Sequence, residues 1–228
     1  MRVARILITL LAVGAVAGCD VAATTLTGTT GGQPAVRVVN AFTSPVDVLV
    51  DGSVAISALA AGQVVSTNTT AGNHSVVLRP TGASTTTSQT ITAATGAMST
   101  IAAAVAVGGA LTSAVLDDTN NVVPSGATKL RVIHLAPNAG TLQVYRTQPD
   151  FSTPVSWQSP FNYQSDPTSA TFVQSTVGSW EVRVWQSPAD ASGWDTAPAR
   201  IIVPLVSGEK ATIVILDKTG GGVRLQLL

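Results

Sequence analysis

The feature that most constrains this chain is an internal repeat of short segments in which apolar and polar residues alternate. The matching pairs are 35–40 with 129–134 and 46–50 with 140–144 at an offset of 94, 72–76 with 178–182 at an offset of 106, and 115–116 with 227–228 at an offset of 112. The change from 94 to 106 means that the second copy has gained 12 residues in between. The chain is therefore expected to fold as two similar units.

Alternation with a period of two is typical of strands that are buried on one face. In the first copy it predicts strands near residues 36–42, 46–51, 63–68, 74–79, 86–92, 99–107 and 111–116. Turn residues punctuate these segments at Asp51-Gly52, Gly72-Asn73, Thr81-Gly82 and Gly108-Gly109. Outside the first segment of the chain, no stretch has the helical period. The expected fold class is all-β, with two tandem immunoglobulin-like β-sandwich domains.

The domain boundaries follow from the repeat and from changes in composition. We expect a signal peptide at 1–18, a lipidated cysteine with a flexible tether at 19–34, β-sandwich domains at 35–116 and 129–228, and a linker at 117–128. The linker prediction rests on a polar run that contains Pro124 and Gly126. A single closed barrel of roughly 200 residues is the alternative architecture.

The first twenty residues have the pattern of a bacterial lipoprotein signal. Arg2 and Arg5 precede an uncharged apolar run, residues 6–17, which is too short to span a bilayer comfortably. Val16-Ala17-Gly18-Cys19 resembles the lipobox, in which cleavage between Gly18 and Cys19 leaves a cysteine that carries diacylglycerol. Two or three acyl chains would anchor the protein stably without spanning the membrane. Asp20 resembles an inner-membrane retention signal.

Charge and cysteine content narrow the function classes. The chain has 12 basic and 12 acidic residues and only 11% charged residues, which argues against nucleic acid as a partner. Cleavage would remove Arg2 and Arg5 and leave a net charge of −2. Cys19 is the single cysteine, so no disulfide framework is possible, and lipidation would protect a thiol that is otherwise reactive outside the cytoplasm.

Two segments carry a family resemblance. Residues 130–138 (LRVIHLAPN) and residues 46–52 (VDVLVDG) are similar to the bacterial domain of unknown function 4397, which typically opens with an R-V-x-H-x-S-P-like strand followed by V-D-V-x-V-D-G. The resemblance implies β domains that are secreted or attached to the envelope. The first copy has Asn40 where the family usually shows histidine. The second copy has Thr141 at the position aligned with Asp47, so neither copy carries both residues.

The chain offers little catalytic or metal-binding chemistry. Its histidines are His74 and His134, and neither lies in a nucleophile elbow. His134 alternates with Leu130 and Val132, which indicates a histidine in the core or at an interface. No cluster suits zinc, and residues 117–120 (DDTN) are a weak calcium candidate. We expect no enzyme activity, no catalytic residues, no metal and no cofactor.

Aromatic residues are concentrated in the second copy. Of the ten Phe, Trp and Tyr residues, Phe42 alone lies in the first copy. Parity along residues 180–185 points Trp180 to the core and Trp185 outward. An outward Trp185, with Trp157 and Trp194 from the inserted segments, could form a platform for a glycan ring or a protein. The alternative is that these rings cover the surface that the insertions add.

These observations together predict a non-enzymatic lipoprotein of the bacterial cell envelope, with a structural or adhesive role. Its expected partners are the membrane, through the anchor, and an envelope protein or glycan. The location would be the periplasmic face of either membrane or the cell surface. Recognition of glycans or proteins by the aromatic loops of the second domain is the alternative. Exposure of Trp157, Trp185 and Trp194 would favour recognition, and a pocket joining His134 to carboxylates would favour catalysis.

Overall fold

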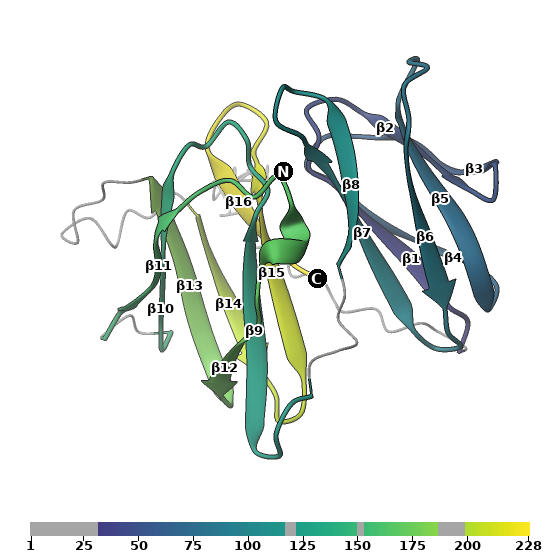
Figure 1. Cartoon of the computed structure of the whole chain (residues 1–228). Helices are drawn as coiled ribbons and strands as arrows, with labels where there is room; N and C mark the ends of the chain where they lie inside the picture. The colour runs from purple at the N-terminus through teal and green to yellow at the C-terminus, as the bar shows by residue number, and fades with distance from the viewer. Residues whose placement is uncertain (1–31, 117–121, 150–152, 187–198) are drawn as a thin grey trace, which may run out of the picture.

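The computed structural model describes residues 32–116, 122–149, 153–186 and 199–228. These residues form sixteen strands and one short 3₁₀ helix, η1 (Pro167–Ser169), arranged as four sheets of four strands (Figure 1). The prediction of an all-β, sandwich-like fold is confirmed. A single closed barrel is wrong, because the strands divide into four separate sheets rather than one closed sheet.

The first sandwich contains eight strands where the sequence predicted seven. They are β1 (Ala35–Asn40), β2 (Val46–Val50), β3 (Ser53–Leu59), β4 (Val64–Asn68), β5 (Gly72–Pro80), β6 (Thr87–Ala93), β7 (Met98–Val105) and β8 (Leu111–Leu116). The missed strand is β3, an edge strand that is almost wholly exposed and therefore has no apolar alternation to detect. The predicted turn before it is present, since Asp51 and Gly52 both have positive φ angles.

The second sandwich has its own eight strands. They are β9 (Ala127–His134), β10 (Leu142–Thr147), β11 (Val155–Phe161), β12 (Val173–Thr176), β13 (Gly178–Gln186), β14 (Ala199–Leu205), β15 (Lys210–Asp217) and β16 (Val223–Leu227). β9 begins two residues inside the segment expected to be linker. Residues 1–31, which hold Gly18 and Cys19, and residues 187–198, which hold Trp194, lie outside the described part of the chain.

Strand order is the same in the two sandwiches. The sheets are β4-β1-β7-β8 with β3-β2-β5-β6, and β12-β9-β15-β16 with β11-β10-β13-β14. The first strand of each sandwich pairs in parallel with the seventh, β1 with β7 and β9 with β15. Each sandwich therefore has two sheets of four strands. The immunoglobulin constant domain instead has seven strands, in sheets of four (ABED) and three (CFG).

The strand registers refine the alignment of the two copies. Val48 lies opposite Leu78 in the first sandwich, and Val144 lies opposite Val184 in the second. Leu78 and Val184 correspond at the offset of 106, so Val48 corresponds to Val144 and the offset between β2 and β10 is 96. The predicted offset of 94 for these two strands is therefore wrong by two residues. The counterpart of Asp47 is Gln143 rather than Thr141.

Each sandwich has a core between its two sheets. In the first it is aliphatic and includes Val36, Val48, Leu78 and Ile101, all without solvent exposure. In the second it includes Leu130, Val184 and Ile213, with Phe161 at its edge and the partly buried rings of Trp157 and Trp180 packed against it. The second sandwich therefore packs two indoles against its core, where the first packs the ring of Phe42.

A third apolar cluster joins the two sandwiches. It lies between the outer faces of the β4-β1-β7-β8 and β12-β9-β15-β16 sheets, which face one another in Figure 1. Its buried members are Val39, Ala41, Ala102, Ala104 and Leu116 from the first sandwich, and Ile133, Leu135, Val214, Leu216 and Leu228 from the second. Because both faces are buried in the contact, the two sandwiches pack as one body.

Equivalent positions supply both sides of this third cluster. At the offsets of 94 and 112 the pairs are Val39 with Ile133, Ala41 with Leu135, Ala102 with Val214, Ala104 with Leu216, and Leu116 with Leu228. Contacts made by the same patch on both partners are the mark of a two-fold arrangement. In four of the five pairs the second sandwich has the larger side chain, so small residues on one side leave room for large residues on the other.

Polar contacts at the edge of the third cluster reinforce it. The Tyr163 hydroxyl donates to the Val105 carbonyl and accepts from the Val105 N–H, each at 2.8 Å. Val105 is the last residue of β7 and lies beyond the end of β1, so its backbone has no partner on that strand. The Tyr163 hydroxyl takes the place of that partner. At Gly62, which has a φ of +75°, a Cβ would stand 3.1 Å from the Asp217 carbonyl oxygen. The sandwiches approach closely at both places.

The third cluster predicts the effect of a substitution at Leu216. Leu216→Ala is expected to lower the free energy of unfolding by about 2–5 kcal/mol, because it opens a cavity between sandwiches that are packed on both sides. Urea unfolding followed by circular dichroism measures this change. Val107→Ala is the control, since Val107 is 94% exposed and its truncation should change stability by no more than about 0.5 kcal/mol. Equal effects of the two substitutions would contradict the prediction.

Candidate functional site

The three tryptophans expected to form a platform do not share a surface. Trp157 is half-buried and packs against the core of the second sandwich. Trp185 points to the other face of the β11-β10-β13-β14 sheet, as parity predicted, but only 7% of it is exposed. Its indole meets the ring of Tyr145 edge-on, with centroids 5.3 Å apart. The expectation of an outward, accessible Trp185 is therefore wrong, and Trp194 lies outside the described residues.

A buried ion pair lies on the same face as Trp185. Glu181 and Arg183 are two residues apart on β13 and form two hydrogen bonds, Nε to Oε1 at 3.1 Å and Nη2 to Oε2 at 3.2 Å. Both side chains are almost completely buried, and Arg200 on β14 approaches Glu181 at 4.0 Å. A planar guanidinium fits a carboxylate in this two-bond geometry, so the pair satisfies its own charges. The alternation along β13 correctly predicts that both side chains lie on the face of the sheet opposite the core, but it does not predict that they are buried there.

His134 is a structural histidine. It has no solvent exposure, its Nε2 donates to the Gly140 carbonyl at 2.9 Å, and its Nδ1 accepts from the Ala136 N–H at 3.2 Å. The rings of Phe161 and Tyr163 contact it. Burial lowers the pKa of His134, which keeps the imidazole neutral with the proton on Nε2. The prediction of a core or interface histidine is confirmed.

Asn40 performs the same task in the first sandwich. Its Oδ1 accepts from the Phe42 N–H at 3.0 Å, and its Nδ2 donates to the carbonyls of Ser44 and Leu59. In both copies the side chain accepts from the backbone two residues ahead and donates to the loop that follows. A histidine and an asparagine are interchangeable here because each offers one acceptor and one donor. Asn40 therefore completes a structural contact in place of the family's histidine.

Asp47 also holds the backbone. Its carboxylate accepts from the Ala58 N–H at 3.0 Å, from Arg79 Nη2 at 2.9 Å and from the Thr81 hydroxyl at 3.0 Å. The Ala58 N–H, followed by Arg79 and Thr81, lowers the Asp47 pKa. Ala58 has a φ of +51° beside the register shift between β2 and β3, so Asp47 fixes a β-bulge. Arg37 lies on β1 in the opposite sheet, where its guanidinium donates to the Thr100 hydroxyl of the neighbouring strand β7.

His74 forms the remaining histidine contact. Its Nδ1 lies 2.7 Å from Asp51 Oδ2, and its Nε2 lies 2.9 Å from the Thr70 carbonyl and 3.2 Å from the Thr69 hydroxyl. The hydrogen bond that Nδ1 donates to Asp51, followed by the one that Nε2 donates to the Thr70 carbonyl, raises the His74 pKa. Two acceptors on opposite nitrogens favour the doubly protonated ring, so His74 is better suited to tie β5 to the β2–β3 turn than to act as a base.

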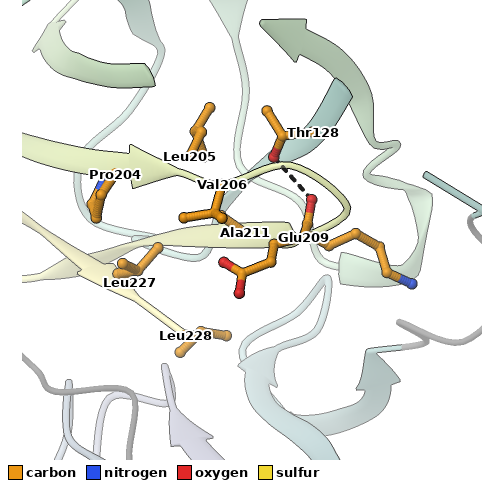
Figure 2. Close-up of a pocket in the computed structure, with 9 residues that line it drawn as sticks. Thr128, Pro204, Leu205, Val206, Glu209, Ala211, Leu227 and Leu228 are labelled. Atoms are coloured by element: carbon orange, nitrogen blue, oxygen red, sulfur yellow. Dashed lines mark hydrogen bonds between the residues drawn. The ribbon is translucent and has the colours of Figure 1, made fainter. Parts of the chain in front are cut away.

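The described part of the chain offers no metal site and one small pocket at a turn. Three or more His, Cys, Asp or Glu side chains do not group there in a way that could hold a metal ion. A pocket at the β14–β15 turn is lined by residues that include Pro204, Leu227 and Leu228, and beside it the Thr128 hydroxyl donates to the Glu209 carbonyl (Figure 2). The pocket holds about 30 Å³, enough for one or two waters.

The fold and these contacts define an all-β protein of packed β-sandwiches in which polar side chains, among them Asn40, His134 and Asp47, hold the backbone. The chain belongs to the family described as Domain of unknown function (DUF4397), which it matches over residues 9–145. The expected family resemblance is thereby confirmed. The match includes the whole first sandwich and reaches into β10. None of the curated proteins compared with the chain matches it.

The structural task of His134 can be tested with the residue found at its counterpart. His134→Asn and His134→Ala both lose the ring contacts, but only alanine leaves the Ala136 N–H and the Gly140 carbonyl unpaired. We expect His134→Asn to retain about 1–3 kcal/mol more stability than His134→Ala, measured by urea unfolding. If the two variants are equally destabilised, the hydrogen bonds of His134 are not what holds this loop.

The His74–Asp51 pair predicts a pH dependence of stability. The His74 pKa is raised from 6.5, so its contribution is present below pH 6.5 and is lost as pH rises through the raised value. The Asp51 pKa is lowered from 3.8, chiefly by His74, so its contribution is present above pH 3.8 and is lost as pH falls through the lowered value. The Tm of the wild type should exceed that of His74→Gln most between about pH 4 and 6.5. A gap that widens toward pH 9 would contradict the assignment.

Proposed function

We propose that the protein is a lipid-anchored, non-enzymatic component of the bacterial cell envelope that displays a rigid pair of β-sandwiches. The observation that carries the proposal is the sequence Val16-Ala17-Gly18-Cys19, which follows an uncharged run headed by two arginines. Within the described residues, no helix has the length and apolar character needed to cross a bilayer. The attachment we propose is acylation of Cys19, with residues 20–34 as the tether.

The chemistry of the described side chains supports a role that is not enzymatic. Both histidines of the chain are engaged through both ring nitrogens, and His134 is fully buried. Asp47 and Glu181 are occupied by arginines and backbone donors. A general base needs an accessible lone pair near a substrate site, and these groups are committed to backbone or ion-pair contacts. The same arrangement suits a structural or adhesive element.

The third cluster supports display as a single unit. Packing of the two sheets removes the freedom that two domains on a linker ordinarily have, so both sandwiches would be displayed in one fixed orientation relative to each other. We also propose that the second sandwich is a further copy of the family domain, because its strand order and parallel first strand repeat those of the first. The glycan platform of Trp157, Trp185 and Trp194 receives less support, since Trp157 and Trp185 face opposite sides of one sheet.

The anchor can be tested by metabolic labelling with a lipid analogue. We expect the wild-type chain to incorporate label and to fractionate with envelope membranes, because the Cys19 thiol carries the lipid. Cys19→Ala should lose label and membrane attachment together. Ser44→Ala is a control that leaves the signal intact. A wild-type protein that is unlabelled and freely secreted would overturn the proposal, and the fraction that holds the labelled protein identifies the membrane.

A further inference from the structure

Arg146 occupies a position where the first sandwich has a valine. On β10 it lies opposite Val182, as Val50 on β2 lies opposite Val76, and both positions face inward at the end of the sheet. The Arg146 guanidinium lies between two indoles, with its carbon 5.1 Å from the Trp157 ring centroid and 5.3 Å from the Trp180 ring centroid. A cation has thus replaced an aliphatic side chain at this end of the second sandwich.

The groups around Arg146 are predominantly hydrogen-bond donors. Nη1 of Arg146 donates to the Ser175 hydroxyl, which can pass a hydrogen bond onward. The Trp157 indole N–H is buried and has no partner among the described residues, whereas the Trp180 N–H donates to the Thr176 carbonyl. A guanidinium has five N–H groups, and Ser175 satisfies one of them. The ring that the Arg146 guanidinium contacts therefore carries an unused donor, the Trp157 N–H.

No carboxylate of the described residues pairs with Arg146, in contrast to Arg79 and Arg183. Partial burial removes water from the guanidinium, which lowers its pKa. The two indole faces offset part of the lost hydration through cation–π attraction, but they accept no hydrogen bond from the guanidinium edge. Charges withdrawn from water in proteins are ordinarily paired, and this partly buried guanidinium has no carboxylate partner among the described residues.

Bulge geometry explains how Trp157 reaches Arg146. Val144 pairs with Gln158 and Tyr145 pairs with Ser156, so Trp157 is the extra residue of a β-bulge on β11. An extra residue re-aims its side chain relative to a regular strand. The equivalent extra residue in the first sandwich is Ala55, between the pairs Val48–Ile56 and Leu49–Val54. The same backbone device is thus present in both sandwiches, but only the second places a ring there.

We propose that Arg146, Trp157 and Ser175 form an oxyanion-binding site at the end of the second sandwich, which takes a carboxylate or phosphate group carried by a ligand. A planar guanidinium matches both groups with two parallel hydrogen bonds, and the indole N–H and the hydroxyl add further donors. The first sandwich has no such site, because Val50, Ala55 and Thr69 stand at the corresponding positions. The inference is independent of the lipid anchor and goes beyond the proposed display function.

The test uses the full-length protein in detergent, titrated with inorganic phosphate and separately with acetate at constant ionic strength. Binding beside Trp157 and Trp180 is expected to give a saturable change in tryptophan fluorescence and a concentration-dependent rise in Tm. Arg146→Val, which installs the residue of the first sandwich, is expected to weaken binding by roughly ten-fold or more. Arg200→Val is the matched control, since it removes the same charge from an exposed position and should leave the titration unchanged.

Several outcomes would overturn the site. They are a wild-type response that does not saturate with either anion, an Arg146→Val protein that binds like the wild type, and an Arg200→Val protein that loses as much affinity as Arg146→Val. If Arg146→Val does not fold, Arg146→Lys replaces it and is expected to bind more weakly, because a lysine cannot make two parallel bonds. Vesicles of phosphatidylglycerol, compared with phosphatidylcholine, distinguish a lipid phosphate from a free one.

Discussion

The two sandwiches share one apolar layer, and burial of that layer stabilises both at once. The outer faces of the sheets that contain β1 and β9 would each expose aliphatic side chains if the sandwiches were apart. Packed together, they leave the inner cores, the Tyr163 contact and the close approach at Gly62 in fixed relation. The relative orientation of the sandwiches is therefore a property of the fold and not of the linker.

The two faces of this shared layer differ in the size of their side chains. A two-fold contact between identical faces would place like residues against like, whereas here Ala102 and Ala104 correspond to Val214 and Leu216. Because small side chains on one face fit large side chains on the other, each face is complementary to its partner within the chain. Away from the layer, the copies differ more freely, as at His74 and Trp180, which occupy equivalent positions on β5 and β13. Residues of the shared layer thus remain apolar in both sandwiches, whereas residues away from the layer differ in chemical type.

Much of the fold was predictable from the sequence, because alternation in strands such as β1 and β5 follows directly from burial of one face. The β3 strand was missed since its residues are exposed, and the offset error at β10 arose because two residues were added in the loop before it. Parity gave the direction of Trp185 but not its burial, which depends on what lies over the sheet. The Arg146 cluster left no local signal, since Trp157, Ser175 and Trp180 meet only through tertiary pairing.

The position of β1 within its sheet has a mechanical consequence. β1 lies between β4 and β7, with five residues paired to one neighbour and six to the other. A pull applied through the residues before Ala35 runs along the strand, so it loads both ladders in shear, and their hydrogen bonds must yield together rather than one after another. The protein would resist a pull on β1 far better than peeling of an edge strand such as β3.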